Sequence, residues 1–198
     1  MNFSTDDMVE LGRLALRFAR KNRVTLHEDG TTPESDTDHT VMLGFVACSV
    51  ASELDGFHAG RVAELTLVHD IVEAYVGDTN SFDISPAAKA AKKQREHDGM
   101  QRMRRDFGED SWLIQTLLAY EAQEEPEARL VRFLDKAMPK INHMLNNCAS
   151  IKRMGKTKAD LIRAHKTQLG DLIEEYPDIS EQVGLLLTEI MLRSEEAW

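Results

Sequence analysis

The stretch "LVHDIVEAYVGD", residues 67–78, decides how this chain is interpreted. One histidine and three carboxylates, His69, Asp70, Glu73 and Asp78, stand in a segment that is otherwise apolar. Charged side chains are rarely buried unless they are paired or bound to a metal ion. The rest of the sequence must therefore explain what neutralises them.

The spacing of these residues gathers them at one end of a helix. Residues three and four positions apart on a helix share a face, and this holds for the pairs Asp70–Glu73 and His69–Glu73. Gly77 is well placed to end that helix. Carboxylates crowded together raise one another's pKa values, and a bound cation removes this conflict. The segment thus predicts one side of a metal site.

A second histidine is also predicted to point inward. His39 opens a predicted helix, and Met42, Leu43 and Val46 share its face, so the imidazole is expected to face the core. A single inward histidine is more often a satisfied core residue than a ligand. His39 by itself therefore identifies no site.

An aspartate in a later helix shows the same inward placement. Asp135 shares its helix face with Val131 and Met138. Pro139 cannot donate the helical hydrogen bond to the carbonyl of residue 135, so the backbone there is expected to be bent or bonded elsewhere. An inward aspartate ordinarily caps a helix or pairs with an arginine, and Arg132 is near enough in sequence for the second role.

Helical periodicity dominates the whole chain. We expect helices at about 6–22, 37–54, 58–76, 86–106, 110–122, 126–147, 157–174 and 178–194. Polar segments such as "RVTLHEDGTTPESDTD" and "DTNSFDIS" are expected to be loops, and no segment gives a convincing strand signal. The predicted fold is all-α: a single-domain helical bundle over residues 1–198, with a metal-site core of about 35–147 and C-terminal helices of about 157–194.

Composition limits the partners and the compartment. The formal net charge of −10 at pH 7 disfavours duplex nucleic acid as a main partner. Cys48 and Cys148 fit no zinc-binding spacing, which favours a reducing compartment, and we expect the cytoplasm. The polar start "MNFSTDD" is unlike a signal peptide, and no apolar run approaches the length of a membrane span, so no membrane partner is expected.

The order of the four inward polar residues is more specific than any one of them. His39, then the pair His69–Asp70, then Asp135 resembles the ligand order of the HD-domain superfamily of metal-dependent phosphohydrolases. The resemblance covers about residues 10–147. It implies an HD-type helical bundle in which these four residues hold one divalent metal ion.

The sequence around the four predicted ligands narrows the resemblance to one branch of the superfamily. "PESDTDHTVML", "HDIVEAYVGD" and "ARLVRFLDKAMPKINHML" are similar to the branch that includes bacterial 5'-deoxynucleotidases. In that branch a glutamate and a Gly-Asp pair follow the HD pair, as Glu73, Gly77 and Asp78 do here. Ala74 after Glu73 argues against the guanosine-tetraphosphate hydrolases, and the missing GYP motif argues against cyclic-di-GMP hydrolysis.

The chain departs from that branch ahead of the first ligand. The deoxynucleotidases carry an Arg-Trp pair there, which binds phosphate and sugar, whereas "KNRVTLHEDG" offers Arg23 with no tryptophan beside it. The resemblance implies that Arg23 binds the substrate phosphate and leaves the sugar preference open. The remaining histidines do not form the extra ligand set of a two-metal site, so one metal ion is expected.

The residue types define the expected chemistry. Two imidazoles and two carboxylates suit Mn, Co, Ni, Fe or Zn. Such an ion acts as a Lewis acid and template for water and a phosphate oxygen. Glu73, one turn from His69 and Asp70, is the candidate general base, because it can reach a water near the metal without being a ligand. Asp78 is a candidate for positioning that water or a sugar hydroxyl.

Three functions follow, and we rank them. The leading hypothesis is a phosphohydrolase acting on nucleotides, most simply 5'-deoxynucleoside monophosphates. A triphosphohydrolase on the same site is the alternative, because the basic segment "KAAKKQR" could bind further phosphates. A catalytically silent HD scaffold or ligand sensor is the alternative of another class. Small HD hydrolases of this type are often dimers, so the resemblance also implies a homodimer.

Overall fold

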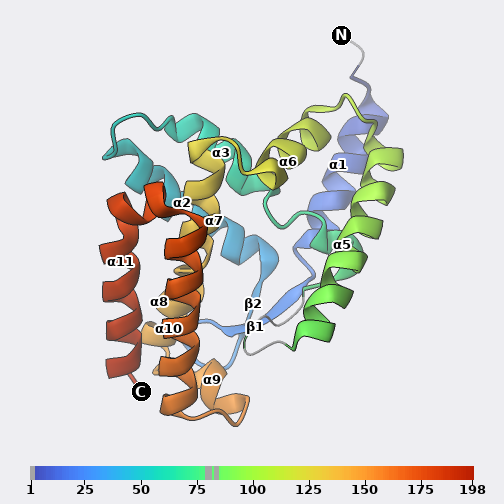
Figure 1. The fold of residues 1–198 in the computed structure, drawn as a ribbon. Coiled ribbons are helices and arrows are strands. Elements are labelled where there is room, and N and C mark those ends of the chain that lie inside the picture. The colour runs from blue at the N-terminus through green and yellow to red at the C-terminus, as the bar shows by residue number, and fades with distance from the viewer. Residues whose placement is uncertain (1–2, 79–81, 83–84) are drawn as a thin grey trace.

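The computed structural model describes residues 3–78, 82 and 85–198. Helices make up most of the regular structure in this part of the chain, which confirms the all-α class (Figure 1). They are α1 (Thr5–Phe18), α2 (Asp36–Ser52), α3 (Ala59–Val68), α4 (Glu73–Val76), α5 (Pro86–Phe107), α6 (Trp112–Ala122), α7 (Pro126–Asp135), α8 (Met138–Leu145), α9 (Ala149–Arg153), α10 (Lys158–Glu175) and α11 (Pro177–Glu196).

Two groups of helices flank a central layer. In Figure 1, α10 and α11 stand on one side of α2, α3 and α7, and α1, α5 and α6 stand on the other. Within the layer α2 packs along α3, and α7 contacts both. α11 packs on α7 and α8, so the C-terminal helices are part of the same compact unit.

The core fills the central layer. Leu43 and Ala47 of α2, Leu65 of α3 and Phe133 of α7 are fully buried there. Apolar side chains of α11 join the same cluster, namely Ile179, Val183, Leu187 and Met191. Burial of such side chains is the main favourable contribution to folding.

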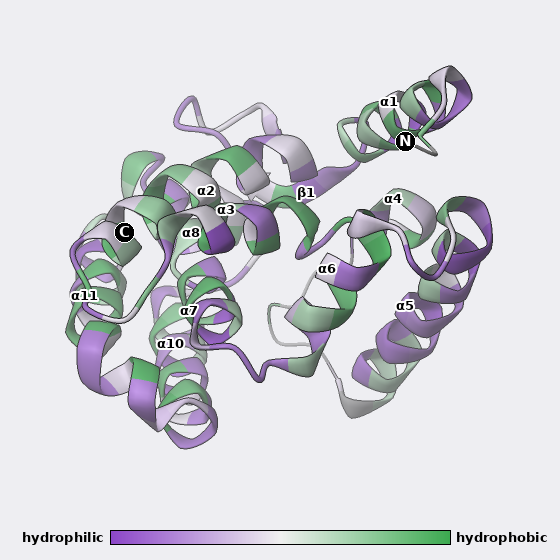
Figure 2. Cartoon of the chain, turned by 90° about the horizontal axis from the view of Figure 1, so that it is seen from above, coloured by the Kyte–Doolittle hydropathy of each residue, from purple (hydrophilic) through white to green (hydrophobic). Residues whose placement is uncertain are grey.

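α5 contacts the bundle mainly through its second half. Figure 2 shows that it is hydrophilic along most of its length. Gly99 allows its backbone to approach α4, since a Cβ at this position would lie only 2.8 Å from Cγ2 of Val72. Met103 is fully buried, whereas Lys89 and Lys93 in the first half are exposed.

The expectation that the chain has no strand was wrong. β1 (Asn22–Leu26) and β2 (Pro33–Ser35) pair as an antiparallel two-stranded sheet, and α1 accordingly ends before the predicted boundary at residue 22. Long-range contacts hold this short sheet. The backbone N–H of Leu26 donates to Ser150 Oγ at 2.9 Å, and Asn146 Nδ2 donates to the carbonyl of Leu26 at 2.8 Å. A strand stabilised by such contacts has only a weak local signal.

The helix expected at 58–76 is broken at the HD pair. α3 ends at Val68 and α4 begins at Glu73. Between them the backbone N–H groups of Ile71 and Glu73 donate to carbonyls three residues back, at 3.1 and 2.8 Å. This tighter winding brings residues three apart onto the same side of the chain, which places Glu73 beside Asp70.

The helix expected at 126–147 is also interrupted, as the proline predicted. α7 ends at Asp135 and α8 begins at Met138, with Pro139 in its first turn. The short α9, which was not predicted, follows two residues with positive φ, Asn147 and Cys148. Within the described residues, no helix combines the length and apolarity that crossing a membrane requires. Most of the loop expected after Asp78 lies outside the described residues.

Candidate metal centre and active site

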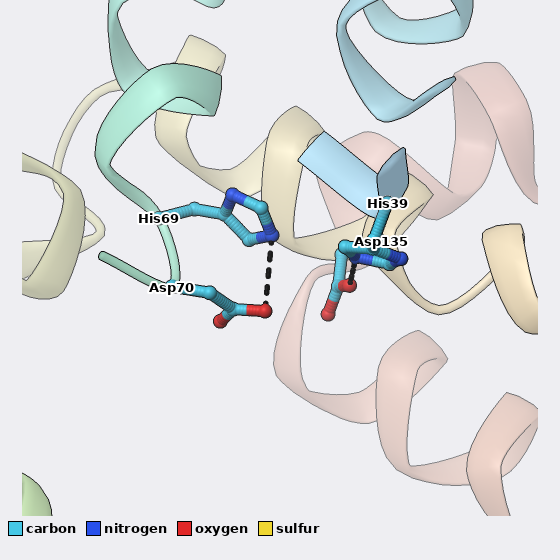
Figure 3. Close-up of side chains that lie close together, drawn as sticks. All are labelled: His39, His69, Asp70 and Asp135. Carbon is cyan, nitrogen blue, oxygen red and sulfur yellow. Dashed lines mark hydrogen bonds and ion pairs between the residues drawn. The ribbon is translucent and has the colours of Figure 1, made fainter. Parts of the chain in front are cut away.

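The four predicted ligands converge at one point. His39 comes from α2, Asp135 from the end of α7, and His69 and Asp70 from the turn after α3. One ligand atom from each residue lies within 4.8 Å of those of the others (Figure 3). Both histidines and Asp135 are buried, while Asp70 is partly exposed to solvent.

Hydrogen bonding fixes how His69 presents its nitrogens. Nδ1 lies 2.7 Å from the backbone carbonyl of Thr66, which can only accept, so Nδ1 carries the proton. Nε2 is then the ring nitrogen that is available to a metal ion. This atom is buried without a hydrogen-bond partner among the described residues, 3.2 Å from Asp70 Oδ2. An unpaired nitrogen facing a carboxylate is the arrangement expected of a metal ligand.

The second pair of ligands is already in contact. His39 Nε2 lies 2.8 Å from Asp135 Oδ1 (Figure 3). Although burial lowers it, the hydrogen bond with Asp135 and the nearby carboxylate of Glu34 raise the pKa of His39 to about 9. The imidazole therefore carries the positive charge that balances the carboxylates in the metal-free protein. A divalent cation at this position would take the place of that proton.

Both carboxylate ligands are held ionised. Despite burial, the positive charge of Lys136 and the hydrogen bond from His39 hold the pKa of Asp135 well below its usual range. Burial also acts against ionisation of Asp70, but His69 and Arg23 lower the pKa of Asp70 below its ordinary value. Two ionised carboxylates with two imidazoles fit a divalent transition metal ion.

The two candidate catalytic residues lie beside this cluster. Glu73 is buried at the start of α4, and its Oε2 has no hydrogen-bond partner in the part of the chain that the structure describes. Burial, together with the charges of Asp70, Asp78 and Asp36, raises the pKa of Glu73 to about 10. Asp78 is partly buried, and its charge acts on both Glu73 and Arg23.

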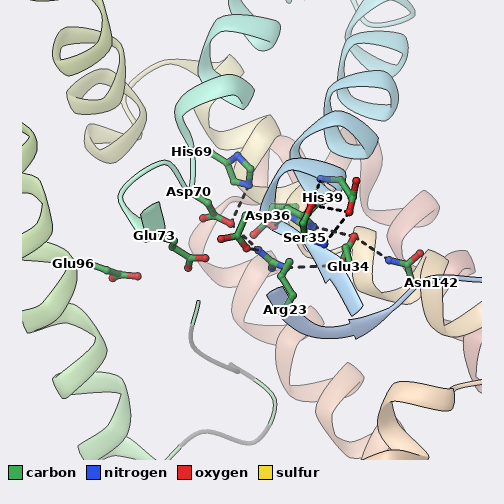
Figure 4. A network of polar contacts seen from close by, with 12 residues as sticks. Arg23, Glu34, Ser35, Asp36, His39, His69, Asp70, Glu73, Glu96 and Asn142 are labelled. Carbon is green, nitrogen blue, oxygen red and sulfur yellow. Dashed lines mark hydrogen bonds and ion pairs between the residues drawn. The ribbon is translucent and has the colours of Figure 1, made fainter. Parts of the chain in front are cut away.

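Arg23 reaches the site from β1. Its Nη1 donates to Asp70 Oδ2 at 3.1 Å and lies 3.5 Å from Asp36 Oδ1, and its Nε lies 3.8 Å from Glu34 Oε2 (Figure 4). The predicted phosphate-binding residue is therefore adjacent to Asp70, a metal-ligand candidate. Arg132, the alternative partner considered for Asp135, instead pairs with Glu121 at 3.7 Å, and Lys136 pairs with Asp135 at 2.6 Å.

Sequence analysis missed two charged residues around the site and left the role of a third, Lys92, open. Glu34 and Asp36 flank the N-cap of α2, and burial raises the pKa of Asp36 to about 7. Lys92 of α5 lies 3.7 Å from Glu73 Oε1 and 3.4 Å from Glu96 Oε1. The only local signal for Glu34 and Asp36 was their position next to the helix that carries His39. Lys92 belongs to the basic segment after Asp78, whose spacing suits a solvated face but from which one or two cations could reach the site.

A family model described as an HD domain matches residues 16–176. The chain belongs to the HD-domain family. The predicted division into a core of 35–147 and later helices stays a prediction, and the family match extends beyond residue 147.

Two curated relatives match part of the chain. The chain is 32% identical over 136 residues to 5'-deoxynucleotidase HDDC2 of Danio rerio, a match covering 66% of this chain and 64% of that protein. It is 33% identical over 106 residues to the Homo sapiens protein of the same name, covering 52% and 50%. The chain thus spans less than two thirds of the length of these relatives.

Solved structures show the same fold. A protein described as a predicted metal-dependent phosphohydrolase from Magnetospirillum magnetotacticum MS-1 superposes with a TM-score of 0.72 at 25% identity, covering 96% of this chain and 92% of its own. A protein from Pyrococcus horikoshii OT3 superposes with a TM-score of 0.62 at 19% identity, covering 94% and 99%. The second likeness concerns the fold alone.

Proposed function

We propose that this protein is a metal-dependent phosphohydrolase that removes phosphate from nucleotides, most simply from 5'-deoxynucleoside monophosphates. One observation carries the proposal: four buried or partly buried metal-ligand candidates, His39, His69, Asp70 and Asp135, converge beside the buried carboxyl group of Glu73. The names of the two relatives and the description of the Magnetospirillum protein support it.

Each residue near the cluster has a role that its position allows. A bound divalent ion would polarise a phosphate oxygen and lower the pKa of a water molecule. Glu73 takes the proton of the attacking water at a carboxylate oxygen, since it lies one turn from Asp70. Arg23, which lies beside Asp70, donates to the phosphate oxygens. Asp78 orients the water or a sugar hydroxyl.

Lys92 favours a monophosphate substrate over a triphosphate. A triphosphate needs a row of cations leading away from the metal. In the basic segment after Asp78, Lys92 turns toward Glu73, whereas Lys89 and Lys93 lie on the exposed side of α5. The triphosphohydrolase remains the second candidate function, because this segment lies next to the site.

A nucleotide panel tests these functions. Mono-, di- and triphosphates of deoxynucleosides and ribonucleosides would be assayed with Mn, Co, Ni, Fe and Zn. Orthophosphate, pyrophosphate and tripolyphosphate would be measured separately. We expect orthophosphate release from a monophosphate with the highest kcat/KM. Release of tripolyphosphate, with a large loss in a Lys92→Ala and Lys93→Ala double variant, would favour the triphosphohydrolase. Metal binding without turnover of any member would favour the sensor.

We also propose a homodimer in the cytoplasm. Large apolar side chains on α11 are solvent-exposed in the single chain, including Leu185 at 86% and Leu192 at 55%. An exposed apolar surface commonly marks a protein interface. Light scattering across a range of concentrations tests the dimer, and a monomer mass throughout would refute it.

The proposed compartment is supported by the two cysteines, which are both free.

A further inference from the structure

Glu34 lies between two functional residues of the site. It sits on β2 and is only 2% exposed. Its Oε1 lies 3.7 Å from Nδ1 of His39, and its Oε2 lies 3.8 Å from Nε of Arg23 (Figure 4). One buried carboxylate thus faces both a metal-ligand candidate and the phosphate-binding candidate.

Asn142 anchors this carboxylate. Its Nδ2 donates to Glu34 Oε1 at 3.0 Å, from α8, and both side chains are buried. One turn further along, Asn146 bonds to the carbonyl of Leu26 on β1. The short sheet is therefore fixed to α8 at two points, and the position of Glu34 is set by a rigid element.

The contact with His39 has a chemical consequence. A carboxylate beside Nδ1 favours the imidazole form that carries its proton on Nδ1, which leaves the Nε2 lone pair free for a cation. Nε2 is the atom that faces Asp135. The contact with Arg23 has a second consequence, because the negative charge restricts where that guanidinium can sit.

We propose that Glu34 is a positioning residue that orients His39 for the metal ion and Arg23 for the phosphate. This inference rests on the proposed function of the site. Glu34 would hold two side chains from different elements in place: His39 on α2 and Arg23 on β1. A change at this single carboxylate affects both metal affinity and phosphate affinity.

Metal affinity tests the first half. Purified apo-protein would be titrated with Co²⁺ against a competing chelator, and the visible absorption of bound Co²⁺ would be recorded. We expect Glu34→Ala to weaken Co²⁺ binding by about 10- to 100-fold. Glu34→Gln keeps the size and one acceptor but not the charge, so it should show a smaller loss. Asn142→Ala should weaken binding in the same direction, because Glu34 loses its anchor.

Phosphate affinity tests the second half. Inorganic phosphate would be titrated into Co²⁺-saturated protein, so that a change reflects Arg23 rather than metal loss. We expect both Glu34 variants to bind phosphate more weakly than the wild type. Unchanged phosphate affinity would remove Arg23 from the proposal.

A matched control separates this role from the general loss of a carboxylate that pairs with a buried histidine. Glu195 Oε1 lies 2.8 Å from Nδ1 of the buried His165, far from the metal cluster in sequence. Glu195→Gln should leave Co²⁺ and phosphate affinity unchanged. Circular dichroism checks folding, and if Glu34→Ala does not fold, the isosteric Glu34→Gln decides.

The outcomes distinguish this inference from the function on which it rests. Equal Co²⁺ affinity in the wild type and in folded Glu34→Gln and Asn142→Ala overturns the role of Glu34, while the proposed hydrolase stands. Weaker Co²⁺ binding in the variants without turnover of any nucleotide by the wild type supports Glu34 and overturns the hydrolase. A wild type that binds no Co²⁺ overturns both.

Discussion

The imidazole rings of His39 and His69 lie with their centroids 5.4 Å apart and their planes inclined by 35°. His39 lies near the start of α2, and His69 follows directly after the end of α3. The two rings lie close together because α2 packs along α3. The packing of two core helices thus sets the distance between two metal-ligand candidates. A change in the core between them is transmitted directly to the site.

Loss of any ligand should release the metal ion. His39→Ala, His69→Ala, Asp70→Ala and Asp135→Ala each remove one donor from the cluster. We expect each purified variant to contain little metal and to lack phosphatase activity. Elemental analysis gives the metal content. His97→Ala, which changes an exposed histidine on α5, should keep the wild-type content. Full occupancy in His39→Ala or Asp135→Ala would contradict the ligand set.

Glu73→Gln should separate chemistry from metal binding. The side chain is buried and is not one of the four clustered ligands, so an isosteric change should keep the fold and the metal. A general base contributes typically about 10²- to 10⁴-fold to the rate. We expect kcat to fall within that range at saturating substrate. A loss of less than about threefold would mean that Glu73 is not the base.

Lys92 should set the pH at which Glu73 becomes active. Burial and the charges of Asp70, Asp78 and Asp36 raise the pKa of Glu73, and the charge of Lys92 lowers it. A base must be deprotonated, so activity rises with pH through this pKa. Lys92→Gln removes the lowering effect, and the rising limb of kcat/KM should move to higher pH. Lys93→Gln, at the exposed neighbouring position, should leave the limb in place. An equal shift of the rising limb of kcat/KM in both variants would contradict a specific effect of Lys92 on Glu73.

The cap of α2 should matter more to the site than an equivalent cap elsewhere. Ser35 and Asp38 form a capping box at the start of the helix that carries His39, and Thr157 and Asp160 form one on α10. Ser35→Ala and Thr157→Ala should each cost about 1 kcal/mol of unfolding free energy. Only Ser35→Ala should also weaken metal binding. Chemical denaturation and metal titration of both variants measure this, and equal metal affinity would argue against a link between the cap and the site.

His143 should make the protein sensitive to acid. Burial, with Lys140 and His165 nearby, lowers the pKa of His143 from 6.5 to about 3. Between these values the unfolded chain binds the proton and the folded chain does not, so the free energy of unfolding falls as the pH falls. The contribution is at most about 1.4 kcal/mol per pH unit. His143→Gln should therefore lose less stability than the wild type between about pH 6.5 and about pH 4. Urea denaturation across this range tests it, with exposed His97→Gln expected to follow the wild type.

Site residues could be predicted where they lie close together in the sequence or follow helical periodicity. His69, Asp70 and Glu73 are close in sequence, and the inward faces of His39 and Asp135 followed from helical periodicity. The break before α8 followed from Pro139, which lacks an N–H donor. The structure brings all of these residues together.

Residues that depend on distant contacts were not predictable. The short sheet of β1 and β2 is held by Ser150 and Asn146, which lie far along the chain. The local sequence of the two strands therefore does not predict them. Glu34 is buried, and its hydrogen-bond partner Asn142 lies far along the chain on α8. Lys92 has the spacing of a solvated helix face, and its contact with Glu73 depends on how α5 docks on α4.

The uneven docking of α5 has a consequence for hydrogen exchange. Its second half is fixed at Gly99 and Met103, whereas its first half contacts the site through the ion pair of Lys92 with Glu73. Helical segments with few buried apolar contacts open locally at low free-energy cost. Amide protons in the first turns of α5 should therefore exchange with solvent much faster than those around Met103. We expect much slower exchange at the amides around His39 of α2, because that helix lies in the core.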